Sequence, residues 1–183
     1  MRIIAGQYRS RQLCTPQGKS TRPTLDKVRE AVFTMLMAYL MEANFLDLYA
    51  GSGANGLEAL SRGAKRAVFV DQSIKSKQAI ISNIKNLELT EKTQVLTCSV
   101  KKAINELLHE KFDLVYIDPP YKVQENENIV RLLITKNLIN DQALIVIEAD
   151  KNDIYPLKIG YMKLIKKKVY GISQILFYQK ESI

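Results

Sequence analysis

The sequence predicts an α/β fold built around a mostly parallel β-sheet. Short apolar runs alternate with amphipathic stretches from residue 45 onward, which is the pattern of repeated strand–helix–strand units. The runs are rich in Val, Ile, Leu and Phe, which indicates strands that are buried on both faces of the sheet. The last two runs are separated only by the region around Gly171, so the sheet is expected to end in an antiparallel hairpin.

Each element can be placed from its residue pattern. Five buried strands are predicted at residues 45–49, 67–70, 93–98, 112–117 and 143–147. Helical spacing of apolar residues predicts helices between them, at residues 56–62, 74–87, 100–108 and 129–138. The terminal hairpin is predicted from residues 162–170 and 172–178. Asp141 and Gly171 are interpreted as turn residues.

Two further pieces precede this core. Residues 2–6 and 11–14 are expected to form a small β-hairpin, followed by a loop that extends to Pro23. Thr24 is a suitable N-cap, and Asp26 lies in the first turn, where a negative charge is favourable. An apolar stripe then predicts one long helix through Val28, Val32, Met35, Leu36 and Tyr39.

Length and composition limit the classes of protein that need to be considered. A chain of 183 residues fits a single domain, with a basic extension over residues 1–23 and a helix plus core over residues 24–183. The longest nearly apolar run, residues 31–41, is shorter than the roughly 18 residues of a membrane helix. No export signal is visible, so we expect a cytoplasmic protein with no membrane partner. Cys14 and Cys98 form no CxxC pair, and one His cannot build the usual metal sites, so no metal is expected.

The net charge of +8 is unevenly distributed along the chain. Residues 1–29 hold seven basic residues and one acid, and residues 151–183 hold seven basic residues and two acids. The residues between them hold thirteen basic residues and sixteen acids. Clustered cations at both ends of the chain suggest docking surfaces for a polyanion, although solvated surface charge is the alternative.

A glycine-rich segment follows the first predicted strand. Gly51, Gly53 and Gly56 form a GxGxxG pattern between a strand and a helix, where glycines let a ligand approach the backbone closely. Asp71 ends the next predicted strand, where its carboxylate can accept hydrogen bonds from both ribose hydroxyls of an adenosine. Asp47 favours S-adenosylmethionine over NAD, because an acid there attracts an ammonium group and repels a pyrophosphate. A tight turn without a ligand is the alternative interpretation.

A second motif follows the predicted strand at residues 112–117. Asp118, Pro119, Pro120 and Tyr121 lie at the carboxyl end of the sheet, where open α/β folds bind ligands. The Asp118 carboxylate and the Pro119 carbonyl can both accept hydrogen bonds from one exocyclic NH2 group. Tyr121 offers a ring on which a flipped-out base can stack, a contact worth roughly 1–3 kcal/mol. An ordinary proline turn is the alternative.

Several segments together resemble the bacterial enzymes that methylate N2 of a guanine in 16S ribosomal RNA. The resemblance covers nearly the whole chain and is carried by residues 2–6, 21–24, 28–31, 46–53, 56–63 and 112–121. It implies a Rossmann-like class I methyltransferase, with a mostly parallel seven-stranded sheet and an antiparallel C-terminal strand. The Asp-Pro-Pro-Tyr motif also serves adenine-N6 and cytosine-N4 methyltransferases, which are the nearest alternative.

The resemblance also implies roles for individual residues. Asp118, Pro119, Pro120 and Tyr121 would be catalytic. The cofactor, S-adenosylmethionine with S-adenosylhomocysteine as its product, would be bound by Asp47, Tyr49, Gly51, Gly53, Asp71, Ser99 and Val100. The N-terminal segment would contact RNA through Arg2, Arg9, Arg11, Lys19 and Arg22. Three positions depart from the family pattern: Ser99 replaces the usual acid, Ser10 a common glycine, and Asn55 a hydrophobic residue.

The expected partner is 16S ribosomal RNA, within a 30S subunit or an assembly intermediate, and a monomer is expected. Two other classes stay open, an NAD-dependent dehydrogenase and a noncatalytic RNA-binding module. The run from Lys166 to Lys168 lies in a predicted strand near the sheet edge. These lysines either contact RNA or discourage edge-to-edge pairing of sheets.

Overall fold

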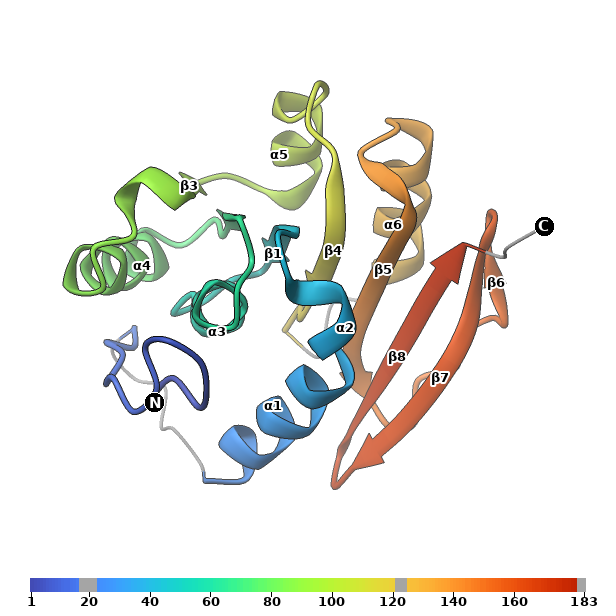
Figure 1. Cartoon of the computed structure of the whole chain (residues 1–183). Helices are drawn as coiled ribbons and strands as arrows, with labels where there is room; N and C mark the ends of the chain where they lie inside the picture. The colour runs from blue at the N-terminus through green and yellow to red at the C-terminus, as the bar shows by residue number, and fades with distance from the viewer. Residues whose placement is uncertain (17–22, 121–124, 181–183) are drawn as a thin grey trace.

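The computed structural model describes residues 1–16, 23–120 and 125–180, and all of its named strands belong to one sheet. The strands are β1 Asn44–Leu48, β2 Arg66–Val70, β3 Thr93–Leu96, β4 Phe112–Ile117, β5 Ile139–Asp150, β6 Lys158–Ile159, β7 Met162–Tyr170 and β8 Ser173–Lys180. Their order across the sheet is β3-β2-β1-β4-β5-β8-β7-β6 (Figure 1).

Helices cover both faces of this sheet. They are α1 Pro23–Met35, α2 Met37–Leu40, α3 Ala54–Ser61, α4 Ile74–Asn86, α5 Val100–Glu106 and α6 Asn126–Thr135, with a 3-10 turn at Thr90–Lys92. Residues of α1 to α4 pack into one buried cluster, and residues of α5 and α6 pack into a second cluster on the other face (Figure 1). Over the described residues, no helix is both long and apolar enough to cross a membrane.

The predicted fold class is confirmed by the direction of the strands. Strands β1 to β5 run parallel to one another, and β8 pairs antiparallel with β5 on one side and with β7 on the other. These seven strands match the expected arrangement. The sheet has eight strands rather than seven, because the two residues of β6 form an additional antiparallel pair with the start of β7.

Three local predictions were wrong. Helix α1 begins at Pro23, before the expected N-cap, because the fixed φ of proline suits the first helical position, and Thr24 is therefore not an N-cap. The predicted long helix is interrupted after Met35. The Tyr39 N–H donates a hydrogen bond to the Leu36 carbonyl three residues earlier, as in the tighter 3-10 helix. Asp141 is not a turn residue but an exposed residue of β5, where it pairs with Lys180 at 2.7 Å.

The N-terminal segment pairs with itself, but through less structure than a hairpin of two strands. One isolated antiparallel bridge joins Arg2 and Gln12. Hydrogen bonds from the Ile3 N–H to the Arg11 carbonyl and from the Ser10 N–H to the Ile3 carbonyl close the loop between them. Ser10 has a φ of 69°, which explains why glycine suits this position in the family pattern.

Candidate active site

The carboxylate of Asp47 is buried beneath the glycine-rich loop. Its side chain is 0% exposed, and one oxygen accepts a hydrogen bond of 2.9 Å from the backbone N–H of Gly56. The other oxygen, Oδ1, is buried without a hydrogen-bond partner. Burial raises the pKa of Asp47 to about 7, although the Gly56 N–H lowers it in part. An unpartnered carboxylate in this position would be stabilised by a nearby cation.

Glycine is needed at two positions of the loop for different physical reasons. Gly51 has a φ of 57°, and only the Tyr49 carbonyl lies within 4.0 Å of a Cβ placed there, so a ligand could approach its backbone. A Cβ at Gly56 would lie 2.3 Å from the ring of Phe69 on β2, so glycine is required for α3 to pack against the sheet. One glycine therefore leaves space above the loop, and the other brings helix and strand together.

Asp71, directly after β2, fixes the loop in place. Its Oδ2 accepts a hydrogen bond of 2.9 Å from the Gly51 N–H, and its Oδ1 accepts one of 2.8 Å from the Ser73 N–H. Each carboxylate oxygen has a second lone pair that can accept another hydrogen bond. Asp71 can thus hold the loop and contact a ligand with the same two atoms.

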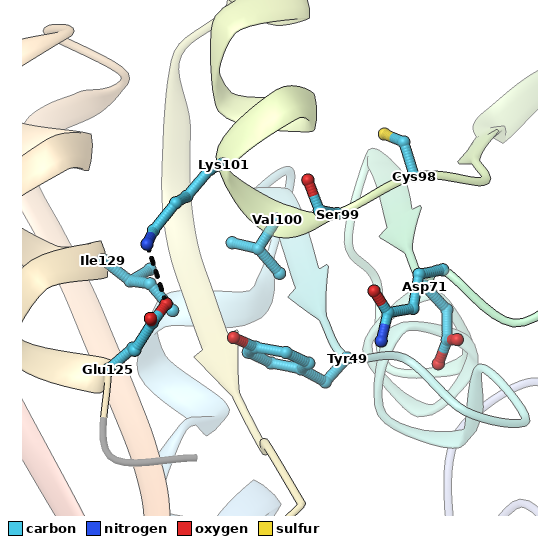
Figure 2. A pocket seen from close by; sticks show the side chains of 9 residues that line it. Tyr49, Asp71, Cys98, Ser99, Val100, Lys101, Glu125 and Ile129 are labelled. Atoms are coloured by element: carbon cyan, nitrogen blue, oxygen red, sulfur yellow. Dashed lines mark ion pairs between the residues drawn. The ribbon is translucent and has the colours of Figure 1, made fainter.

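A cavity of about 320 Å³ opens beside these residues. Figure 2 shows Tyr49 between Asp71 on one side and the Lys101–Glu125 ion pair on the other, with Ser99 and Val100 opposite. Four predicted cofactor residues line it, namely Tyr49, Asp71, Ser99 and Val100, whereas Asp47, Gly51 and Gly53 are not among its lining residues. The other lining residues were not predicted: Gln72, Cys98, Lys101, Glu125 and Ile129.

The lining groups combine apolar surface with a few fixed polar atoms. Burial raises the pKa of the Tyr49 phenol, and the charge of Glu125 raises it further, so Tyr49 is neutral at pH 7. Lys101 and Glu125 form an ion pair of 3.0 Å. The Ser99 hydroxyl caps α5 by accepting a hydrogen bond from the Lys102 N–H. Its remaining lone pair can accept a further hydrogen bond, for example from an adenine amino group.

The second motif lies next to the first across the sheet. The backbone N–H of Asp118, directly after β4, donates to the carbonyl of Leu48 at the end of β1, at 3.3 Å. Pro119 is buried and Pro120 is exposed, whereas Tyr121 lies outside the described residues. The hydrogen bond between Asp118 and Leu48 brings the two motifs together, because the glycine-rich loop begins immediately after Leu48.

A buried tyrosine and a glutamate extend the Asp118 region. The Tyr116 hydroxyl lies 3.3 Å from Oε2 of Glu148, and the charges of Glu148, Asp118 and Asp47 all act on it. Burial raises the pKa of Glu148, while hydrogen bonds with Tyr116 and Ser173 lower it in part. Glu148 was not among the site residues predicted from the sequence. The available signal for Glu148 was its position, because it is a charged residue directly after an apolar predicted strand.

The N-terminal segment is attached to α3 by polar side chains. The buried carboxylate of Glu58 accepts hydrogen bonds from the backbone N–H groups of Ile4 and Ala5, at 2.8 Å and 3.0 Å, and pairs with Arg62 at 2.7 Å. Ser61 accepts a hydrogen bond from the Tyr8 N–H and donates one to the Ala5 carbonyl. Because α3 begins at the glycine-rich loop, the segment has a fixed position relative to that loop.

Three of the five predicted RNA-binding residues lie within the described residues. Arg2 has a side chain that is 60% exposed and lies 3.9 Å from Asp26. Arg9 is exposed, and the exposed Arg11 donates a hydrogen bond of 2.9 Å to the carbonyl of Asn86. Lys19 and Arg22 lie outside the described residues. Among the described residues, no group of three or more His, Cys, Asp or Glu side chains is arranged to hold a metal ion.

Comparison with known proteins places the chain in a family. The model of the family described as Conserved hypothetical protein 95 matches residues 1–179. The chain belongs to this family. A relative from Escherichia coli K12, named Ribosomal RNA small subunit methyltransferase D, is 34% identical over 185 residues, covering 100% of this chain and 91% of the relative. The family resemblance seen in the sequence is therefore confirmed.

Two further relatives support the assignment to the Conserved hypothetical protein 95 family. YlbH from Bacillus subtilis is 37% identical over 182 residues, covering 98% of this chain and 99% of the relative. The solved structure of yhhF from Escherichia coli has a TM-score of 0.84 at 33% identity and covers 100% of this chain and 99% of that one. The similarity thus extends over the fold and the whole described chain.

Proposed function

We propose that this protein transfers a methyl group from S-adenosylmethionine to the exocyclic N2 amine of a guanine in 16S ribosomal RNA. The hydrogen bond between the Asp118 N–H and the Leu48 carbonyl is the observation that carries the proposal. It brings the glycine-rich loop and the Asp-Pro-Pro motif to neighbouring strand ends, which suits a reaction between a nucleoside cofactor and a base. Proximity of two reactants is a large part of such catalysis.

The residues around the cavity fit the proposed cofactor. Asp71 has lone pairs available for ribose hydroxyls, and Gly51 leaves open space in front of its backbone. The unpartnered Oδ1 of Asp47 provides negative potential where a cationic methionine moiety is expected. Asp47 is 0% exposed in the structure, so we propose that it acts on this charge from beneath the loop.

In the proposed reaction the protein positions the target amine. When bound, S-adenosylmethionine supplies an electrophilic methyl group and leaves as S-adenosylhomocysteine. The Asp118 carboxylate and the Pro119 carbonyl each accept one N–H of the amine, which directs the nitrogen lone pair toward the methyl carbon. The new N–C bond forms as the S–C bond breaks, and the amine then loses one proton, for which Asp118 is the nearby acceptor. Positioning and electrostatics supply most of the catalysis.

Glu148 favours guanine over the other amino-bearing bases. Guanine presents two adjacent donors, N1–H and the N2 amine, whereas adenine and cytosine present a ring-nitrogen acceptor beside their amine. A second carboxylate close to Asp118 can accept the N1–H of guanine, and the same carboxylate would repel the lone pair of an acceptor nitrogen. We propose this role for Glu148 in addition to the amine contact at Asp118.

The proposed substrate is 16S ribosomal RNA within the 30S subunit or an assembly intermediate, and we propose that the protein acts as a monomer in the cytoplasm. The names of the relatives and the exposed Arg2, Arg9 and Arg11 support this proposal. Nucleoside mass spectrometry of 16S ribosomal RNA from a strain that lacks the gene tests it. We expect one N2-methylguanosine to disappear and to return with the gene. Loss of N6-methyladenosine or N4-methylcytidine instead would contradict the assignment.

A further inference from the structure

Strand β7 carries three lysines at the edge of the sheet. Lys166, Lys167 and Lys168 are exposed, and β6 pairs only with the first two residues of β7, so this part of the strand has no neighbour on its outer side (Figure 1). None of the three forms an ion pair with any residue that the structure describes. The edge is therefore a concentration of positive charge that no ion pair among the described residues neutralises.

The register of the sheet divides these lysines between its two faces. Lys166 pairs with Phe177 and Lys168 with Ile175, and both partners belong to the buried cluster on the α1 face. Lys167 pairs with Leu176, which belongs to the cluster on the opposite face. Directly paired residues share a face, so Lys166 and Lys168 lie on the α1 face and Lys167 lies on the other.

The same register relates Lys168 to the candidate active site. Lys168 pairs with Ile175, and Ile175 pairs with Glu148 of β5. Glu148 and Asp118 directly follow Ile147 and Ile117, which are partners in the parallel pair of β4 and β5. Asp118, Glu148 and Lys168 thus follow one line across the sheet. Three strand spacings of about 4.8 Å put β7 roughly 14 Å from β4.

We propose that Lys166 and Lys168 form a phosphate-binding edge for the RNA strand that carries the target base. The inference rests on the proposed function and adds a second RNA contact on the opposite side of the active site from the N-terminal segment. Phosphates are the occupant that fits, because unpaired cations release counterions when they bind a polyanion. A purely protective role against edge pairing would use all three lysines alike, since it depends on charge at the edge and not on the face.

Charge reversal of single lysines tests the proposal. It keeps the edge charged, so any protection against edge pairing is retained. Lys168→Glu and Lys167→Glu are matched variants, because they alter adjacent exposed residues on opposite faces by the same charge. The probe is the small ribosomal subunit from a strain that lacks the gene. Binding affinity and methyl transfer are measured separately over a series of KCl concentrations, with thermal melting to confirm that each variant is folded.

We expect Lys168→Glu to weaken binding about tenfold at low salt and to raise KM, with kcat and the affinity for S-adenosylmethionine unchanged. The double variant Lys166→Ala/Lys168→Ala should lower the slope of log affinity against log salt by about 1.4, at roughly 0.7 for each lost contact with a single strand. Lys167→Glu should bind within about twofold of the unmodified protein.

Equal effects of Lys167→Glu and Lys168→Glu on binding would overturn the proposal. Unchanged binding by both Lys168→Glu and the double variant Lys166→Ala/Lys168→Ala would also overturn it. These outcomes differ from a failure of the proposed function. If the unmodified protein binds subunits without methylating guanine and the face-dependent loss of binding persists, the proposed function fails and the phosphate-binding edge stands.

Discussion

The cofactor cavity and the Asp118 region are held together in different ways. In the cavity, Asp71 is fixed by backbone N–H groups of Gly51 and Ser73, which lie just after the ends of β1 and β2, two adjacent strands connected by α3. Around Asp118, side chains from distant segments meet, as in the contact between Tyr116 and Glu148, which are 32 residues apart. The first region depends on local backbone geometry and the second on the register of the sheet. Substitutions should therefore separate cofactor binding from base recognition.

The largest expected effect is that of Asp118→Ala on methyl transfer. The variant loses one of the two proposed acceptors for the target amine, so we expect kcat to fall by about 10²–10³, the range seen when one preorganised catalytic hydrogen bond is removed. The affinity for S-adenosylmethionine, measured by calorimetry, should stay within about twofold. Asp118→Asn retains one oxygen acceptor and should lose less. Turnover by Asp118→Ala close to that of the unmodified protein would refute the role of Asp118.

The opposite pattern is expected for Asp71→Ala. This substitution removes the acceptor for two backbone N–H groups and the proposed ribose contact. The dissociation constant for S-adenosylmethionine should rise about 10–100-fold, because hydrogen bonds to charged groups are worth about 1.5–3 kcal/mol. Binding of the small subunit should be unchanged, and saturating cofactor should restore much of kcat. A loss of RNA binding in this variant would contradict the proposed separation of the two regions.

Asp47 should make both stability and cofactor binding depend on pH. Its pKa is raised to about 7 in the folded protein, so the folded state holds a proton that the unfolded state releases near pH 4. Stability should fall as pH rises from about 4 to 7, by about 1.4 kcal/mol for each unit of raised pKa, and then level off. Asp47→Asn should lack this slope in urea unfolding curves at pH 5 and pH 8.

The same titration should appear in binding. A cationic cofactor bound at the loop favours ionised Asp47, so the affinity for S-adenosylmethionine should rise between pH 6 and pH 8 and binding should release a proton. Calorimetry in two buffers of different ionisation enthalpy measures this release. Equal proton release by the unmodified protein and by Asp47→Asn would show that Asp47 does not face the cofactor charge.

Tyr116→Phe is expected to have the smallest effect. The hydroxyl hydrogen bond lowers the pKa of Glu148 against the effect of burial, so its removal should raise that pKa further. We expect kcat to fall about 3–10-fold, with the greater loss at low pH, where Glu148 becomes protonated and can no longer accept the guanine N1–H. Cofactor affinity provides the control and should be unchanged. A pH profile identical to that of the unmodified protein would contradict the link between Glu148 and base recognition.

The sequence was sufficient to predict the glycine-rich loop with Asp71, and part of the Asp118 region. Gly51, Gly56 and Asp71 could be predicted because they lie in consecutive turns of one strand–helix–strand unit, where glycine spacing and a carboxylate at the strand end are visible in the sequence. Strand β4 was predicted with its observed bounds, which put Asp118 at the carboxyl edge. Glu148 could not be predicted, because its proximity to Asp118 depends on the pairing register of β4 and β5. The break after Met35 was missed because the apolar stripe continues through it at helical spacing.

The most direct test is methyl transfer in a purified system. The protein is incubated with S-adenosylmethionine labelled in its methyl group and with small subunits from a strain that lacks the gene, and the modified nucleotide is mapped after digestion. We predict label in a single N2-methylguanosine of 16S ribosomal RNA, and its absence with Asp118→Ala. Label in another nucleoside, or undiminished label with Asp118→Ala, would contradict the account.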